Sequence, residues 1–383
     1  MAHGNPSLQA TTAEHRALLA DSVADFVARG TDIARVRRLR GTSAEYDRAV
    51  WKQMAELGWL GILVPEHYGG LGLGLAEMAL VAKGLARSLA PEPFTAAAVL
   101  AATALAASEN EPLKDEYLPR FASGECLPVL AWQEQAGALD PLVVEASATA
   151  FEGGYKLNGV KRFVSGAAQA DAFLVSARGR DGIVLLWVPR DTAGVQISLE
   201  LLADGRSFAT LALDDALAPK ACVAAAGFAA EEALARAFDH GAAIVGAELL
   251  GVGERALEMT LDYLKTRVQF GKPIGAFQAL QHRAVDLYIQ KEIASAVLEE
   301  GLAALDSGPA APERAAIASR VKARCADAAL RITREAIQLH GAIGFTDEYD
   351  AGLYLKRALT LAAWLGHASW HRRRYARLTG GAS

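Results

Sequence analysis

The sequence is short of several features that would define a function at once. It has only three cysteines in 383 residues, Cys126, Cys222 and Cys325, and they are too far apart for metal-ligand spacing. An odd, scattered set is typical of reduced thiols, so we expect a cytoplasmic protein with no metal site. No run approaches the roughly 18 apolar residues of a membrane-spanning helix, and the first residues lack the apolar core of a signal peptide.

Basic residues are not in excess either. The formal net charge is −5, which argues against a nucleic-acid partner because such proteins need a basic face. No Ser-His-Asp arrangement, phosphate-binding loop or zinc motif stands out. Apolar residues make up 52% of the chain, which is enough for a sizeable core in one large unit or in two to three packed units.

The hydrophobic pattern changes character twice along the chain. Up to about residue 124 it is helical: Leu19, Val23 and Phe26 fall on one face, and further helices are expected over 45–57 and after the glycine-rich run 69–74. A middle segment then carries short apolar runs bounded by Gly, Pro or Asp, as strands are. These runs are 143–149, 155–164, 172–177, 183–188, 195–199 and 208–213. Asn158-Gly159 predicts a hairpin turn within the second run.

After residue 227 the chain returns to long helical periodicity. Segments 230–267, 277–306, 312–340 and 348–378 are separated by short glycine- or proline-containing breaks, which predicts a four-helix bundle. The predicted fold class is therefore α+β, with three domains. They are an N-terminal helical domain (1–125), a middle small β-barrel or sandwich domain (126–226) and a C-terminal four-helix bundle (227–383).

Local motifs are informative only in part. The run Gly69–Gly74 favours a loop before a helix, because Leu75 stands where a dinucleotide fingerprint needs its last glycine. Arg267 ends a long helix next to Gly271, where it could pair with an anionic ligand or simply offset the helix dipole. His340 ends another helix and, taken alone, is more often a packing or capping residue than a proton carrier.

Two longer stretches are far more specific. The segments RVQFGKPIGAFQALQHR (267–283) and AIQLHGAIGFTDEYD (336–350) resemble the acyl-CoA dehydrogenase family, and the resemblance covers nearly the whole chain. PEHYGGLGLGLAE (65–77) and YKLNGVKRFVSGA (155–167) support it. The resemblance implies an α, β-barrel, α architecture, bound FAD, an acyl-CoA substrate and an electron-transferring flavoprotein or similar acceptor. It also implies tetramers, homomeric or heteromeric, formed through the C-terminal bundles.

The resemblance also implies which residues bind FAD. Phe163 and Ser165 match positions that pack on the flavin ring and hydrogen-bond near its N5. The adenosine-diphosphate side is matched by Arg267, Gln269, Phe270 and Gln278, and the motif that reaches a neighbouring subunit's FAD by Gln338, His340 and Gly341. We expect segments 267–271 and 338–341 to converge across a subunit boundary on this dinucleotide.

The catalytic base departs from the family pattern. Dehydrogenation needs a carboxylate to remove the α-proton of the thioester while the β-hydride leaves for the flavin. The two positions where the family places its glutamate are Gly241 and Leu365 here, and neither has a proton-accepting group. Ala242 replaces the usual arginine, and Gln133 and Leu139 replace hydroxyl residues near flavin and substrate.

Three interpretations follow. LYLKRAL (353–359) with Leu365 resembles the base-lacking subunits of heteromeric members that act on bulky acyl-CoA, and this interpretation is favoured. Alternatively, the protein is a homomeric acyl-CoA dehydrogenase with a relocated base, for which Glu248 is the nearest candidate. Glu248 lies two turns beyond Gly241, a shift of about 10 Å along a helix axis. The third interpretation is a non-catalytic flavin-binding or scaffold homologue.

Overall fold

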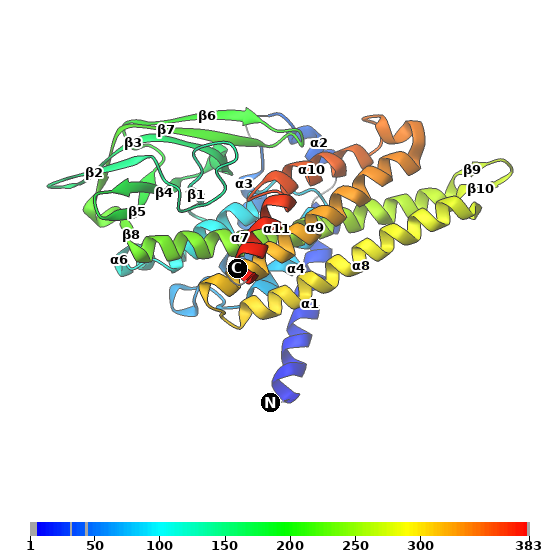
Figure 1. Ribbon diagram of the computed structural model, residues 1–383, viewed down its shortest axis with the longest axis horizontal. Coiled ribbons are helices and arrows are strands. Elements are labelled where there is room, and N and C mark those ends of the chain that lie inside the picture. Colours follow the sequence, from blue (N-terminus) through cyan, green and yellow to red (C-terminus); the bar gives the residue numbers. More distant parts are fainter. Residues whose placement is uncertain (1–5, 31–32, 43–44, 381–383) are drawn as a thin grey trace.

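The computed structural model describes residues 6–30, 33–42 and 45–380, and it has the predicted order of helices, strands and helices. The sheet lies towards one end of the long axis of the molecule, and the long C-terminal helices extend away from it (Figure 1). The α+β fold class is confirmed. Within the described ranges, no helix is both long and apolar enough to cross a membrane.

The N-terminal part is helical, as predicted, but contains one feature that the sequence did not indicate. A seven-residue π-helix, η3, has a wholly buried sequence, Thr-Ala-Ala-Ala-Val-Leu-Ala, and such helices often occur at functional sites. The helices are α1 (Pro6–Gly30), α2 (Ile33–Leu39), α3 (Arg48–Glu56), η1 (Trp59–Gly61), η2 (Glu66–Tyr68), α4 (Leu75–Arg87), η3 (Thr95–Ala101), α5 (Ala102–Ala106) and α6 (Glu111–Ala122).

The middle part forms one eight-stranded sheet in the order β6-β7-β3-β2-β4-β5-β8, with β1 beside β4. Its inner strands β4 and β5 are almost continuously apolar and buried, as expected for a sheet covered on both faces. The strands are β1 (Pro128–Ala131), β2 (Ser147–Phe151), β3 (Gly154–Ser165), β4 (Ala172–Gly179), β5 (Gly182–Pro189), β6 (Val195–Leu201), β7 (Ser207–Pro219) and β8 (Val223–Ala226), with 3-10 turns η4 (Ala167–Gln169) and η5 (Lys220–Cys222).

The hairpin predicted at Asn158-Gly159 is wrong. Both residues lie inside β3, and the chain turns between β2 and β3 at residues 152–153. The Asn158 amide donates to Asp215 Oδ1 at 2.9 Å, and the Asp215 N–H donates back to Asn158 Oδ1 at 2.9 Å. A Cβ on Gly159 would lie 2.7 Å from that of Ala146. The pair therefore forms a bulge in the β3–β7 ladder, where glycine allows a close strand approach.

The C-terminal part is the predicted helical bundle, linked by a small hairpin. Its longest member, α7, has 39 residues, so it spans about 58 Å from the sheet to the far end of the molecule. The elements are α7 (Phe228–Thr266), β9 (Val268–Gln269), β10 (Lys272–Pro273), η6 (Ile274–Ala276), α8 (Gln278–Asp306), α9 (Ala311–His340), η7 (Gly341–Phe345), α10 (Ala351–Ala363) and α11 (Ala368–Thr379).

The fourth predicted helix, 348–378, is in fact two helices with a break between α10 and α11. The fully buried Lys322 on α9 donates to the carbonyl oxygens of Leu361, Ala362 and Gly366 at 3.0–3.3 Å. Leu361 and Ala362 lie in the last turn of α10, where carbonyls lack partners within the helix, and Gly366 lies in the break itself. Burial lowers the pKa of Lys322 to about 7. The break is thus held by one side chain from a neighbouring helix, which periodicity cannot reveal.

One buried arginine joins all three parts of the chain. Arg357 on α10 is 4% exposed and donates to Asp204 Oδ2, in the β6–β7 turn, at 2.7 Å. It also donates to the carbonyls of Ala90 at 3.1 Å and Leu89 at 3.2 Å, which follow α4. Asp204 is further paired with Arg206 at 2.8 Å. Because a buried charge needs such partners, this cluster fixes how the three parts are packed.

Candidate functional site

The predicted adenosine-diphosphate residues gather at the end of the bundle farthest from the sheet. A cavity of about 580 Å³ is lined by the end of α7, the β9–β10 hairpin and the end of α9. It includes Arg267 and Gln269 from the first segment and Gln338, His340 and Gly341 from the second. The two segments therefore converge within one chain, which corrects the expectation that they meet across a subunit boundary.

The cavity presents exposed polar side chains and accessible backbone. Arg267, Gln269 and Gln338 are exposed, and Gly341 has a φ of 64° with no atom within 4 Å of where a Cβ would stand. A left-handed glycine with open space around it lets a ligand approach the main chain. An arginine beside such a surface suits the paired oxygens of a diphosphate.

His340 belongs to this cavity, but its ring is not free. The side chain is 2% exposed, and its Nδ1 lies 2.7 Å from the Ala336 carbonyl and its Nε2 2.9 Å from the Tyr349 hydroxyl. The rings of Tyr263 and Tyr349 each lie 4.5 Å from it. Burial lowers the pKa of His340, so the imidazole is neutral near pH 7. His340 shapes the cavity wall and leaves ligand contact to its neighbours.

Phe270 and Gln278 do not line the cavity in the single chain. Phe270 stands at the tip of the β9–β10 hairpin, is 90% exposed, and has a φ of 53°. Gln278 is the first, exposed residue of α8. A phenylalanine held exposed with a left-handed backbone carries strain, which is typical of residues that bind a partner or ligand.

Phe163 and Ser165 lie on β3 in the sheet, away from the β9–β10 hairpin (Figure 1). The ladder to β7 shifts register between Lys161 and Val164, and Phe163 has a φ of 58°. This bulge interrupts the alternation of side chains between the two faces of the sheet at Phe163 and Ser165, which are both half-buried. Bulges of this kind are frequent beside active sites.

The segment opposite β3 is fixed by a buried ion pair. Lys161 is wholly buried and donates to Glu134 at 2.5 Å and to the Ser176 hydroxyl at 3.0 Å. Burial lowers the pKa of Lys161 to about 8. The Gln133 side-chain amide donates to the Gln135 carbonyl at 3.1 Å, and Leu139 is 8% exposed. The structure thus orders this segment without the hydroxyl groups that the family pattern provides.

The two positions of the missing base come together. A Cβ built on Gly241 would lie 3.0 Å from Leu365 Cδ1 and 2.3 Å from Leu100 Cδ2. Leu365 is 1% and Leu100 3% exposed, so both fill this space. Leu365 has a φ of 55°, and its carbonyl lies 2.8 Å from His371 Nε2. The place where a carboxylate would act is therefore packed with hydrocarbon.

Glu248 does not take over that place. It is hydrogen-bonded to Thr95, at the opposite end of η3 from Leu100, and it interacts electrostatically with the Arg206 and Arg357 charges. Burial raises its pKa, while the Thr95 hydroxyl and the two arginines act in the opposite sense. The carboxyl group is therefore bound to η3, about two helical turns along α7 from Gly241.

Comparison with known proteins decides the family. The acyl-CoA dehydrogenase N-terminal, middle and C-terminal domain models match residues 12–125, 130–216 and 230–379. The chain belongs to the acyl-CoA dehydrogenase family. It is therefore an oxidoreductase of the class that acts on the CH–CH group of acyl-CoA, with FAD as cofactor.

Relatives of this acyl-CoA dehydrogenase align with almost its whole length. The acyl-CoA dehydrogenase IpdE2 of Mycobacterium tuberculosis is 30% identical over 91% of the chain and 92% of its own length. Among solved structures, the Tcur3481-Tcur3483 steroid ACAD G363A variant is 28% identical over 96% of the chain and 98% of its own, with a TM-score of 0.87. The ChsE4-ChsE5 complex of M. tuberculosis is 26% identical over the same shares, also with a TM-score of 0.87.

The residues present fit FAD at one end of the molecule. Gly341 leaves room at the main chain, and Arg267, Gln269 and Gln338 offer donors to phosphates and ribose. Sequence reasoning did not identify three residues that shape the site. Tyr263, in the cavity wall, could have been predicted from its position one helical turn before Arg267. Leu100 and Lys322 belong to no sequence motif that would indicate their roles.

Proposed function

We propose that this acyl-CoA dehydrogenase is the base-lacking subunit of a heteromeric complex that oxidises a bulky acyl-CoA. The observation that carries the proposal is the apolar filling of the base site by Leu100 and Leu365 beside Gly241. A thioester α-proton needs an ionisable acceptor within hydrogen-bond reach. This chain offers none there, so a partner of the same fold supplies the carboxylate.

The geometry of one chain also favours a shared cofactor. The sheet that contains β3 and the β9–β10 hairpin lie towards opposite ends of the long axis (Figure 1). The family resemblance matches Phe163 and Ser165 to the flavin ring and Gln338 and Gly341 to the FAD of a neighbouring subunit, and Arg267 lines the same cavity as Gln338 and Gly341. We therefore assign the ring-side residues and the diphosphate-side residues of one chain to two different FAD molecules. FAD, when bound, accepts the hydride. At its diphosphate-side cavity, this chain holds an FAD molecule whose flavin ring lies on the partner subunit.

An exposed apolar stripe supports assembly through the bundle. Val285, Tyr288, Ile289 and Ile293 on α8 follow helical spacing and are 45–56% exposed. Large apolar side chains in such a row are typical of helices that pack against another chain. The proposed assembly is a tetramer in which α8 faces a second bundle, and the proposed electron acceptor is an electron-transferring flavoprotein.

Two similar proteins point the same way. The Tcur3481-Tcur3483 structure is called a steroid ACAD, and the ChsE4-ChsE5 structure is called a complex, so each names two components. Steroid-derived acyl groups are bulky, and we extend that class of substrate to this chain. A heteromeric complex is thus supported by the missing carboxylate, by the division of the FAD contacts between two subunits, and by the likeness to two-component proteins.

The test is an assay of the purified chain alone and together with its co-purifying partner. With an artificial electron acceptor and a panel of acyl-CoAs, we expect turnover only from the complex. Turnover by the lone chain, lost in Glu248→Gln, would instead establish the relocated base. Absence of a flavin absorbance band in both preparations would favour the non-catalytic scaffold, and mass spectrometry identifies the partner.

A further inference from the structure

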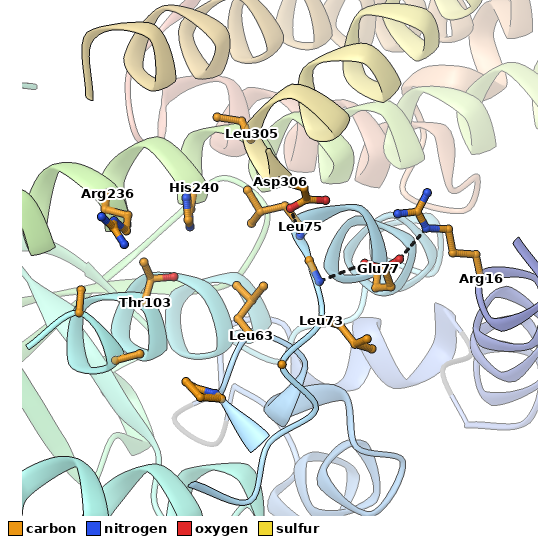
Figure 2. A pocket seen from close by; sticks show the side chains of 15 residues that line it. Arg16, Leu63, Leu73, Leu75, Glu77, Thr103, Arg236, His240, Leu305 and Asp306 are labelled. Atoms are coloured by element: carbon orange, nitrogen blue, oxygen red, sulfur yellow. Dashed lines mark hydrogen bonds and ion pairs between the residues drawn. The ribbon is translucent and has the colours of Figure 1, made fainter. Parts of the chain in front are cut away.

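At the start of α4, the free backbone donors find partners within the chain. A cavity of about 720 Å³ lies there, between the loop before α4, the end of α5, α7 and the end of α8 (Figure 2). The N–H groups of Leu75 and Ala76 donate to Asp306 at 2.7 and 3.1 Å, and Glu77 is paired with Arg16. The first turn of this helix is therefore satisfied without a ligand. The outer edge of strand β6 has no such partners.

The two outermost strands of the eight-stranded sheet, β6 and β8, are protected to different degrees. β8 has only four residues, its ladder to β5 is irregular, and its Ala224 carbonyl accepts from the Glu109 N–H at 3.1 Å. β6 has seven residues, pairs with β7 without a register shift, and runs along the outside of the sheet (Figure 1). Edge strands are usually protected by lysine, proline or a bulge, and β6 has none of these.

The hydrogen bonds at the two ends of β6 show which of its backbone groups face outwards. The Gly194 carbonyl accepts from the Asp214 N–H at 2.9 Å, and the Leu202 N–H donates to the Arg206 carbonyl at 2.8 Å. Bonded pairs alternate along an antiparallel ladder, so the even-numbered residues of β6 bond to β7 and the odd-numbered ones face away from it. The Val195 N–H donates within the preceding turn. Among the described residues, the other outward groups have no hydrogen-bond partner.

The side chains of the odd-numbered residues form an apolar stripe that extends beyond the core. Val195 and Ile197 are half-buried and pack on the core, whereas Leu199 is 43% and Leu201 is 68% exposed. The other face of β6 carries three exposed polar side chains, Gln196, Ser198 and Glu200. One edge of the molecule therefore presents unpaired backbone groups and exposed leucines together.

We infer that β6 pairs antiparallel with β6 of a second copy of this chain, about a two-fold axis at Ser198. In this register, Ile197 lies opposite Leu199 of the second copy, and each residue of this pair directs its backbone groups towards the other. Val195 likewise lies opposite Leu201. Each exposed leucine is thus covered by an apolar side chain of the second copy, and the sheet continues from one chain into the next.

The polar face of the strand supports the same register. Gln196 lies opposite Glu200 of the second copy, so an amide donor faces a carboxylate and no like charges are opposed. This is also the register that pairs all seven residues of β6. Two edge strands bury less than the roughly 1,200–2,000 Å² of a stable interface, so the contact is weak by itself. It is separate from the proposed α8 contact and does not depend on the missing base.

A disulfide trap tests this pairing in the purified full-length chain. Ser198→Cys places two thiols opposite each other at the axis, where the Cα atoms of the facing residues lie about 4.5 Å apart, within the range of a disulfide. Cys222→Ala removes the one native thiol that is not buried. On mild oxidation, we expect at least fivefold more covalent dimer than from Thr149→Cys, an exposed position on β2. Mass spectrometry of the dimer should show residue 198 joined to itself.

A second substitution asks whether the apolar stripe holds the two strands together. Leu199→Lys places a charge opposite Ile197 of the second copy, and we expect the yield of the Ser198→Cys dimer to fall at least fivefold. Gln196→Lys adds the same charge to the polar face, opposite Glu200, and is the matched control that keeps the yield. Circular dichroism melting verifies that each variant is folded.

Three outcomes would overturn the inference. These are equal dimer yields from Ser198→Cys and Thr149→Cys, a yield that Leu199→Lys leaves unchanged, and a disulfide from residue 198 to a different protein. If Leu199→Lys fails to fold, the comparison of the two cysteine variants still decides. None of these measurements depends on turnover or on FAD, so a negative result would leave the proposed function standing.

Discussion

The two ends of α7 preserve different parts of one chemistry. At its C-terminal end, Arg267, Gln338 and Gly341 border an open cavity with free donors and accessible main chain. Towards its N-terminal end, Gly241 faces Leu100 and Leu365, which leave no room and offer no proton acceptor. If the proposed roles hold, cofactor binding and proton removal depend on residues many turns apart, and one can be lost without the other.

The largest expected effect comes from restoring an acid to the closed end. In Leu365→Glu, we expect dehydrogenation by the flavin-loaded lone chain to rise by about 100-fold or more, the usual contribution of a general base. Burial raises the pKa of the new carboxyl group, so the rate should increase with pH until it ionises. Steady-state rates against pH give the answer, and Leu365→Gln is the control. Equal rates in both variants contradict the interpretation of this site.

The next largest effect is expected on stability, from removing the Lys322 side chain that holds the break between α10 and α11. Lys322→Met leaves three carbonyls without a donor, and we expect the free energy of unfolding to fall by about 2–4 kcal/mol. Chemical denaturation measures it, with exposed Lys265→Met as the control. Flavin binding by the complex should persist, since the ADP end is remote. A variant as stable as the wild type would remove Lys322 from this role.

The same lysine predicts a pH dependence. Its pKa is lowered to about 7, below that of an unfolded lysine, so between about 7 and 10 the unfolded chain binds the extra proton. Its contribution to stability therefore rises with pH across this window. The difference in unfolding free energy between wild type and Lys322→Met should grow as pH increases from 7 to 10. A constant difference would contradict the shifted pKa.

A smaller effect is expected at the open end. Arg267→Gln removes charged hydrogen bonds to phosphate, so we expect FAD to bind about 10- to 100-fold more weakly to the assembled complex. Flavin fluorescence on dilution measures this. Arg334→Gln, on the exposed face of α9, is the control. If FAD affinity is unchanged, the cavity at 267–269 and 338–343 holds something else.

The smallest effect is expected between the two ends. Because burial raises the pKa of Glu248, its ionisation costs stability as pH rises above the unfolded pKa, and Glu248→Gln removes that cost. We expect the activity of the complex to stay within about twofold of the wild type. Its free energy of unfolding should stay within about 1 kcal/mol, with any change towards higher stability. Paired assays at pH 7 check this. A large loss of activity with retained flavin would make Glu248 the base.

Much of this could be predicted from the sequence, for identifiable reasons. Long helices such as α7 and α9 follow helical periodicity, so these elements were predicted correctly. The residues assigned to FAD sit in contiguous motifs that could be matched to a family, and their role remains a prediction. The Asn158-Gly159 turn failed because its glycine serves a close strand approach to Ala146, which is a tertiary contact. The domain limits at 125 and 226 and the cytoplasmic location remain predictions.

The closed base site shows the limit of sequence reasoning more clearly. Gly241 and Leu365 reveal that a carboxylate is missing, but not what fills the space. Leu100 does so from a π-helix, and nothing in an alanine-rich sequence distinguishes a π-helix from an α-helix.

The arginine that joins three parts of the chain has a thermodynamic consequence. Arg357 is bonded at once to Asp204, Leu89 and Ala90, so no part can detach without leaving a buried charge unmatched. Calorimetric melting should accordingly show one cooperative peak for helices and sheet alike. In Arg357→Met the peak should split or broaden, with the sheet losing its ellipticity at a different temperature from the bundle.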